Sequence, residues 1–361
     1  MKKIVFILML IATDVFANSV SEWQRVFENV KEAYVYKVDV ADLAVALLKG
    51  MPKIDKNLQV GNDASKITLY YRGKVVAVAR KPDDVNDAKE WAKISEKIID
   101  EALHKSKKAR QRDFEIDDVL SEEMVKILDK DSKFYPDFDS ANGINIDNHR
   151  TFAARMEDNV LYVKIGVFNK QTVANLRQVW SDNGTADAII IDLKGCGGGM
   201  TKEAIEAIDL FLDDGIIVST VGHDKDEEVF YNAKKDNIWG TKPIYVLVDG
   251  ATASAAEIFA AAIQEQSRGK IIGTATKGKG TMQKLIKLPS GSVLAVTNLF
   301  YKTPSGKGLD GNGVKPDVCT FEMPEDRNVE GLLRIKNDKC MAEYREDSEL
   351  ELNTALYMLN N

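Results

Sequence analysis

The chain has 361 residues, of which 44% are hydrophobic and 29% charged, so it is neither disordered nor fibrous and is long enough for two domains. Its formal net charge of −7 disfavours a dedicated nucleic-acid binder, which needs a basic surface. The three histidines are scattered and the three cysteines form no C-x-x-C motif, which disfavours zinc, haem and hydride chemistry.

Residues 1–17 have the pattern of a removable signal peptide. Two lysines precede an apolar run of nine residues, Ile4 to Ala12, and Val15-Phe16-Ala17 offers small residues for cleavage before Asn18. A transmembrane helix is the alternative, but nine residues are too few to cross a hydrocarbon layer of roughly 30 Å. We therefore expect an exported protein, periplasmic or secreted, with no stable membrane insertion.

Residues 18–138 are expected to form a mainly helical N-terminal domain that contains one hairpin. Apolar residues at helical spacing predict helices that begin near Ser21 and Val40, and two more over 87–107 and 115–129. Two apolar runs on either side of Arg72-Gly73-Lys74 predict the hairpin. The polar segment from Asp137 to Asn148 is the best candidate for a domain boundary.

From residue 139 to residue 325 the pattern changes to alternating strands and helices. Continuous apolar runs predict strands at Val160–Ile165, Ala188–Ile191 and Ile244–Val248, with helices following them. Such units form a layered α/β core, in which functional groups lie where strands end and helices begin. Residues 326–361 are expected to form a short helical tail. In an oxidising compartment Cys319 and Cys340 either form a disulfide or remain two separate thiols.

Three segments of the core carry candidate functional residues, and each also has a purely structural explanation. Ser254 opens a helix, but Ser254-x-x-Glu257 is also a capping box. The glycine loop at 195–199 also allows a strand to approach a helix closely. Lys279 stands between two glycines, although a lysine in a loop is usually exposed to solvent.

The stretch from Gly273 to Gly280 has the spacing of a phosphate-binding loop. However, its last position is glycine instead of serine or threonine, and the residues that follow it predict a hairpin. Such a loop must open a helix whose N-terminus binds phosphate. The sequence therefore disfavours nucleotide binding.

Taken together, these segments suit a hydrolase. A serine hydroxyl is a weak nucleophile that needs a base within hydrogen-bond reach, and no histidine lies near these segments. Lys279 can act as that base if burial lowers the pKa of its amine towards neutrality. Backbone N–H groups of the glycine loop and of Ala255 would then stabilise the oxyanion.

These segments resemble the carboxy-terminal processing, or tail-specific, serine peptidases, which use a Ser/Lys dyad. Lys279 follows Ser254 by 25 positions, which is the spacing that the family uses. The matching segments run from about Leu161 to Asp317. They are Asp192-Leu193-Lys194 with its glycines, Ser254-Ala-Ala-Glu257-Ile258, Gly278-Lys279-Gly280 with Gln283, Tyr301-x-Thr303-Pro304-Ser305-Gly306, and Gly313-Val314-Lys315-Pro316-Asp317.

The resemblance implies a crotonase/ClpP-like core and an endopeptidase that needs no metal or cofactor. Its substrates would be unfolded or C-terminally exposed polypeptides, bound as an added β-strand. The terminal helices would act as a cap or support a homodimer. The implied roles are Ser254 as nucleophile, Lys279 as general base, Gln283 as the residue that orients Lys279, and N–H groups of Ala255 and of Gly198 or Gly199 as oxyanion donors.

The chain departs from the family pattern in two places. The family usually has a PDZ domain between its core and a motif that Ile127 to Ser132 resembles, but here the segment up to Val160 is too short, so we expect that domain to be absent. Cys196 and Lys194 stand where the family commonly has Asn and Arg. No histidine accompanies Cys196, which favours a tolerated small residue over a rival nucleophile.

An alternative function is that of a catalytically inactive relative that binds polypeptides as a scaffold. Ser254, Lys279 and Gln283 are all present, and a protein that only binds has no need to retain them. The sequence therefore favours the peptidase.

Overall fold

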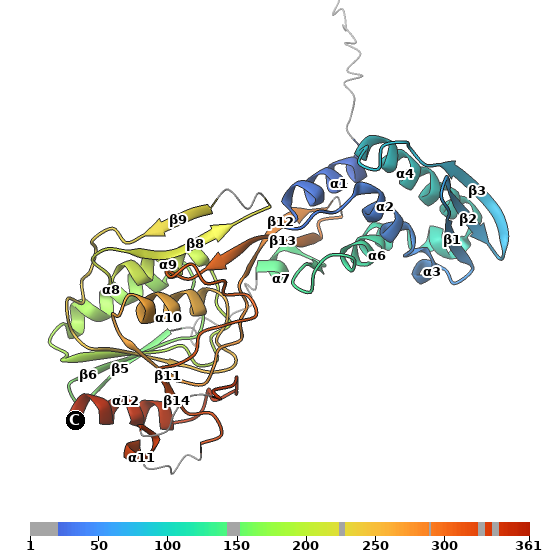
Figure 1. Cartoon of the computed structure of the whole chain (residues 1–361). Coiled ribbons are helices and arrows are strands. Elements are labelled where there is room, and N and C mark those ends of the chain that lie inside the picture. The colour runs from blue at the N-terminus through green and yellow to red at the C-terminus, as the bar shows by residue number, and fades with distance from the viewer. Residues whose placement is uncertain (1–20, 143–151, 224–227, 289, 324–328, 334–338) are drawn as a thin grey trace, which may run out of the picture. The chain divides into compact units, whose positions relative to one another are not determined.

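The structure is a computed structural model that describes residues 21–142, 152–223, 228–288, 290–323, 329–333 and 339–361 (Figure 1). The expected signal peptide lies outside these residues. The chain divides into two compact units, which we describe separately. The first comprises the chain up to Glu32 with Val38–Ile127 and Leu288–Ser290, and the second comprises Ala33–Lys37, Leu128–Lys287 and Gly291–Asn361. None of the described helices is long and apolar enough to cross a membrane.

The N-terminal unit consists of helices and a small antiparallel sheet. The sheet has the order β1-β2-β3, so the expected hairpin is confirmed as β2 and β3, and β1 is a strand that we did not predict. The large side chains of Leu43, Leu47 and Trp91 are fully buried in α2 and α4. The elements are α1 (Glu22–Ala33), α2 (Val40–Leu48), α3 (Met51–Ile54), β1 (Leu58–Asn62), β2 (Lys66–Tyr71), β3 (Lys74–Arg80), α4 (Ala88–Lys105), α5 (Lys107–Gln111) and α6 (Asp113–Val125).

The centre of the C-terminal unit is a six-stranded sheet with the order β14-β11-β10-β7-β6-β5. Its strands run parallel except for β5, which pairs antiparallel with β6. The predicted strands at 160–165, 188–191 and 244–248 are confirmed as β6, β7 and β10. The strands are β5 (Phe152–Glu157), β6 (Val160–Ile165), β7 (Ala188–Asp192), β10 (Ile244–Val248), β11 (Lys270–Gly273) and β14 (Val318–Cys319).

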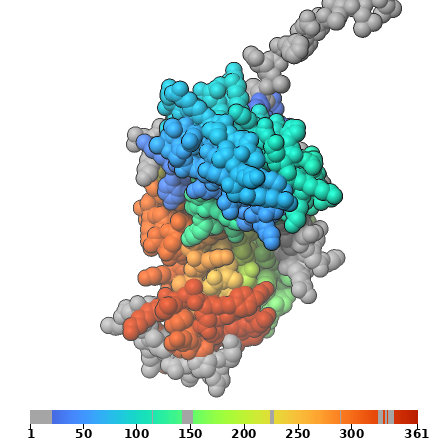
Figure 2. Space-filling view, turned by 90° about the vertical axis from the view of Figure 1, so that its right-hand side faces the viewer, coloured from blue at the N-terminus to red at the C-terminus, as the bar shows by residue number. Residues whose placement is uncertain are grey.

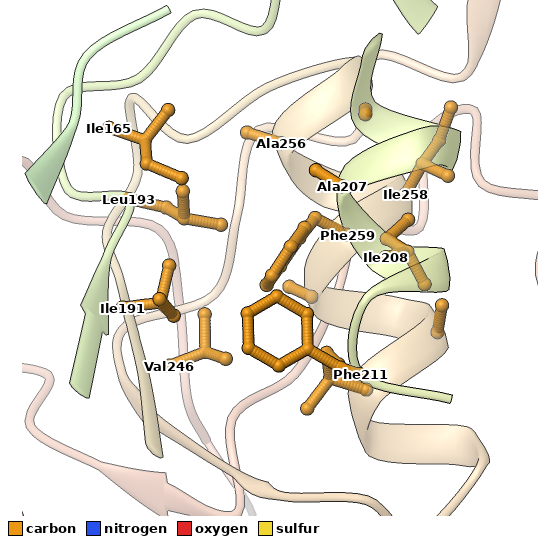
Figure 3. Close-up of a cluster of buried hydrophobic side chains, with 14 of the residues drawn as sticks. Ile165, Ile191, Leu193, Ala207, Ile208, Phe211, Val246, Ala256, Ile258 and Phe259 are labelled. Carbon is orange, nitrogen blue, oxygen red and sulfur yellow. The ribbon is translucent and has the colours of Figure 1, made fainter. Parts of the chain in front are cut away.

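Helices cover both faces of this sheet. On one face lie α8 (Thr172–Asn183), α9 (Thr201–Asp209) and α10 (Ala255–Glu265), and on the other lies α12 (Leu350–Asn360). Ile191 and Val246 of the sheet face Phe259 of α10 and Phe211, which follows α9 (Figure 3). This packing holds the carboxyl ends of β7 and β10, and hence the loops that follow them, in a fixed position.

A second sheet has the order β12-β13-β8-β9, and β4 pairs with β13. The predicted hairpin after Gln283 is confirmed as β12 and β13. A bulge interrupts the pairing of these strands, because Met282 lies opposite Leu299 but Gln283 lies opposite Thr297. Such a bulge re-aims the side chains beside it. The remaining elements are β4 (Lys133–Tyr135), α7 (Phe138–Asn142), β8 (Ile216–Val221), β9 (Glu228–Asn232), β12 (Thr281–Lys287) and β13 (Val293–Lys302).

The C-terminal segment is fastened to the main sheet by a disulfide between Cys319 of β14 and Cys340, whose Cα atoms are 5.9 Å apart. The sequence left open whether these two cysteines form a disulfide or remain separate thiols, and the structure contains the disulfide. After this bond the chain hydrogen-bonds along loops of the main sheet, and it then forms α12. Figure 2 shows the segment, in red, at the surface of its unit. The short helix α11 (Val329–Leu333) precedes the second cysteine.

Candidate active site

Ser254 occupies a sharp turn between β10 and α10. Its φ of +57° and ψ of −121° are unusual for a residue with a side chain. Strained backbone of this kind concentrates at functional sites, and a nucleophilic serine commonly stands at such a strand-to-helix turn. The turn is held by the buried carboxylate of Asp249, whose Oδ1 accepts the N–H groups of Ala251 and Thr252, each at 3.0 Å. Ser254 itself is half-buried.

Lys279 lies in the loop between β11 and β12. Its Nζ donates to Oε1 of Gln283 at 3.3 Å, so the structure brings these two predicted residues together. Burial lowers the pKa of the Lys279 amine below that of an ordinary lysine, and the carboxylate of Asp131 acts in the opposite direction. Lys279 is therefore half-buried, and the alternative explanation that it is an ordinary exposed lysine in a loop does not apply.

The segments of Ser254 and Lys279 are joined by Glu257, a fully buried residue of α10. Its Oε2 accepts the backbone N–H groups of Ser254 at 2.8 Å and of Lys279 at 2.9 Å. Its Oε1 accepts the hydroxyl of Thr276 at 2.5 Å and the N–H of Gly278 at 2.6 Å. Four donors satisfy the carboxylate without a cation, so the cost of burying its charge is offset by hydrogen bonds.

Sequence reasoning identified Glu257 only as a capping residue. The capping contact to the Ser254 N–H is present, but the same carboxylate also holds the Lys279 loop. The glycines on either side of Lys279 were the sequence signal for this contact. A glycine has no side chain, so its backbone can approach a buried carboxylate closely.

The glycine loop lies directly against the Ser254 turn. A Cβ placed on Gly198 would be 2.7 Å from the carbonyl oxygen of Ala253 and 3.0 Å from the nitrogen of Ala255. Within the described part of the chain, no hydrogen bond engages the N–H groups of Gly198, Gly199 or Ala255. Gly198 and Ala255 are buried, whereas Gly199 is exposed and packs on Phe168. The Gly198 backbone and the Ala255 N–H therefore lie beside Ser254, which is where an oxyanion site requires its donors.

Neither Cys196 nor Lys194, the two residues that depart from the family pattern, is placed as a reactive group. Cys196 is fully buried, and burial raises the pKa of its thiol to about 12, so no thiolate forms near neutral pH. Lys194 is also buried, and its Nζ binds the backbone oxygen of Ser348 and lies 3.5 Å from Oε2 of Glu351. It therefore connects the glycine loop to α12.

Residues 159–320 match the family model described as peptidase family S41. The C-terminal unit contains a peptidase family S41 domain. This match spans the glycine loop, the Ser254 turn, the Lys279 loop and Gln283. The resemblance inferred from the motifs is thereby confirmed at the level of the family.

Curated proteins similar to this domain are named carboxy-terminal processing proteases. The carboxy-terminal-processing protease of Bartonella bacilliformis is 35% identical over 178 residues, which are 47% of this chain and 41% of that protein. The carboxy-terminal processing protease CtpA of Bacillus subtilis is 33% identical over 176 residues, which are 48% and 37%. The chain thus spans less than half the length of these relatives.

Among solved structures, a photosystem II D1 C-terminal processing protease is 32% identical, with a TM-score of 0.42. The alignment covers 50% of this chain and 47% of that one.

Proposed function

We propose that this protein is a serine endopeptidase of the C-terminal processing type, with Ser254 as nucleophile and Lys279 as general base. The observation that carries the proposal is that Oε2 of Glu257 binds the backbone of both residues, which keeps the strained serine and the buried lysine at one site. The S41 match and the names of the relatives support the same reaction class.

The reaction begins when the Ser254 Oγ bonds to the carbonyl carbon of the scissile peptide and its proton passes to the neutral Lys279 Nζ. The developing oxyanion accepts the N–H groups of Ala255 and Gly198, and one such donor contributes about 3 kcal/mol to barrier lowering. The C–N bond then breaks, the leaving amine takes the proton from Lys279, and an acyl ester remains on Ser254.

Water completes the cycle. Lys279, neutral again, accepts a proton from the water that attacks the ester, and the returned proton restores the Ser254 hydroxyl as the carboxylate product leaves. Gln283 keeps its amide oxygen on Lys279 throughout. All these steps use groups of this chain and need no metal or cofactor.

The proposal extends to the location, the fold subclass and the substrate. An exported protein is supported by the leader pattern and by the disulfide, which persists in an oxidising compartment. The parallel order of the βα units supports a core of the crotonase/ClpP-like type. The names of the relatives, which state carboxy-terminal processing, support polypeptides with accessible C-terminal ends as substrates. The family resemblance of the motifs further implies unfolded polypeptides that bind as an added strand.

The test is digestion of reduced casein at mildly alkaline pH in the presence of EDTA. The wild type and the Ser254→Ala variant are compared, and we expect cleavage by the wild type alone. Cleavage by both proteins would remove Ser254 as nucleophile. If neither cleaves, capture of casein by both would favour the polypeptide-binding alternative.

A further inference from the structure

The Gln283 amide contacts Lys279 at one end and a cluster of polar side chains at the other. The reaction described above does not use this cluster. The Gln283 Nε2 lies 3.0 Å from the hydroxyl oxygen of Thr281 and 3.4 Å from that of Thr297. Behind the two threonines lie two aspartates of the turn that precedes β4. Asp131 Oδ2 is 2.9 Å from the Thr281 hydroxyl, and Asp129 Oδ1 is 3.0 Å from the Thr297 hydroxyl.

The hydrogen positions in this cluster follow from the types of donor and acceptor. A carboxylate only accepts, and a threonine hydroxyl has one proton. The Thr281 proton is therefore directed to Asp131, and its oxygen is left as an acceptor towards Gln283. The same reasoning applies to Thr297, whose proton is directed to Asp129.

This arrangement fixes which end of the Gln283 amide faces Lys279. If the amide were turned around, its oxygen would meet the Thr281 oxygen at 3.0 Å with no proton between them. The Gln283 NH2 group therefore faces the two threonines, and its oxygen accepts from Lys279.

We propose that Asp131 is a positioning residue for the general base: through the Thr281 hydroxyl it fixes the Gln283 amide so that the lone pair of Lys279 stays free for Ser254. Asp129 supports the same orientation through Thr297. This inference rests on the proposed function, because it assigns a role relative to the base of that reaction.

The orientation matters because a neutral lysine amine has two N–H donors and one lone pair. With the Gln283 oxygen facing it, the amine gives one N–H to the amide and keeps its lone pair for the serine proton. With the amide reversed, the NH2 group of Gln283 would donate to that lone pair and block proton transfer.

Asp131 also carries a charge, and its effect on Lys279 has a defined sign. The carboxylates of Asp131 and Glu257 favour the charged amine and raise its pKa, whereas the Lys133 and Lys277 cations and burial lower it. Removing the charge of Asp131 therefore lowers the pKa of Lys279. The base then loses its proton at a lower pH. Reversal of the Gln283 amide has a separate effect, because it lowers the maximal rate.

The test compares the pH profiles of kcat/KM for the wild type and Asp131→Ala, which removes both the charge and the acceptor of the Thr281 hydroxyl. We expect a maximal rate roughly tenfold to a hundredfold lower, as for loss of a hydrogen bond to a charged group, together with an acidic limb displaced to lower pH. Asp139→Ala, which removes an exposed carboxylate from α7 in the same unit, is the matched control and should change neither.

A second comparison separates positioning from folding. Thr281→Ser keeps the hydroxyl and should retain activity, whereas Thr281→Val should lower it. Asp131→Ala should add no further loss of maximal rate in the Thr281→Val background. An additive loss in the double variant, or an unchanged rate and acidic limb in Asp131→Ala, would overturn the proposal.

A third readout does not depend on peptidase activity. In the Ser254→Ala background, competitive acetylation of Lys279 by acetic anhydride is measured across pH by mass spectrometry, with and without Asp131→Ala. A lower pH of half-maximal labelling in the Asp131 variant supports an electrostatic action of its carboxylate on Lys279, and an identical pH counts against the inference. An inactive wild type would defeat the proposed function, and this measurement would still decide whether Asp131 acts on Lys279.

Discussion

The backbone nitrogens of Ser254 and Lys279 donate to the same atom, Oε2 of Glu257, at 2.8 Å and 2.9 Å. Because one oxygen atom holds both N–H groups, any displacement of the lysine loop is transmitted to the serine turn. The proposed nucleophile and base are thus positioned through their backbones, which leaves their side chains free to react.

Replacing Glu257 by Gln tests this shared acceptor. One end of the new side chain is an NH2 group, which cannot accept a hydrogen bond. At the Oε2 position it would face the N–H groups of Ser254 and Lys279, and at the Oε1 position it would face that of Gly278. We expect the free energy of unfolding to fall by about 1–3 kcal/mol, and kcat to fall because the Ser254 and Lys279 segments separate. Denaturant unfolding and casein digestion measure the two effects. Glu265→Gln, an exposed site on the same helix, is the control, and equal losses in both variants would contradict the role of Glu257.

Lys279 gives a prediction for the pH dependence of activity. The base acts only when neutral, and burial lowers its pKa below the 10.5 of an ordinary lysine. Activity should therefore rise with pH as the amine deprotonates and level off above that pKa. Lys279→Arg should abolish activity at every pH, because the guanidinium does not lose its proton in proteins. Lys277→Arg, at an exposed neighbouring site, should keep the wild-type profile of kcat/KM. An active Lys279→Arg enzyme would remove the dyad.

The glycine loop allows a matched pair of substitutions. Gly198 has a φ of +106°, and a side chain there would meet the Ala253 oxygen at 2.7 Å, whereas a Cβ on Gly197 has nothing within 4 Å. We expect Gly198→Ala to lower kcat by roughly 10²–10³, the effect of losing an oxyanion donor, and Gly197→Ala to leave it nearly unchanged. Steady-state kinetics on a peptide substrate measures both. Similar kcat values for the two variants would exclude the Gly198 N–H from the oxyanion site.

The sequence predicted the strands of the main sheet because continuous apolar runs such as Ala188–Ile191 have few alternatives to burial on both faces. It also predicted Ser254, Lys279 and Gln283 as one group, since the order and spacing of their motifs are specific. It missed β1, whose residues Leu58–Asn62 include a glycine and two polar amides and carry no clear alternation.

The supporting residues of the site could not be predicted for a different reason. Glu257, Asp131 and Thr297 act through contacts between segments up to 168 positions apart, and local pattern does not encode such contacts. The bulge between Met282 and Gln283, after which Gln283 lies opposite Thr297, likewise depends on the pairing of two strands.

The disulfide gives a prediction about the C-terminal segment. The Cys319–Cys340 bond closes a loop of 21 positions, so its removal should lower the free energy of unfolding by about 3 kcal/mol in the chain-entropy model. Beyond Cys340, the carbonyl of Glu343 accepts the Gly250 N–H at 2.6 Å, and the Arg345 N–H donates to the Asp249 carboxylate at 3.0 Å. Reduction should therefore also loosen the turn that leads to Ser254.

The measurement for the disulfide is denaturant unfolding with and without reductant. A reductant should destabilise the wild type, and it should have no further effect on the Cys319→Ser/Cys340→Ser variant, which starts at the lower stability. Cys196→Ala is the control, since that buried thiol is free and its substitution leaves the bond in place; it should still respond to reductant. Equal stability of the oxidised and reduced wild type would show that the contacts of Glu343 and Arg345 hold the segment without the bond.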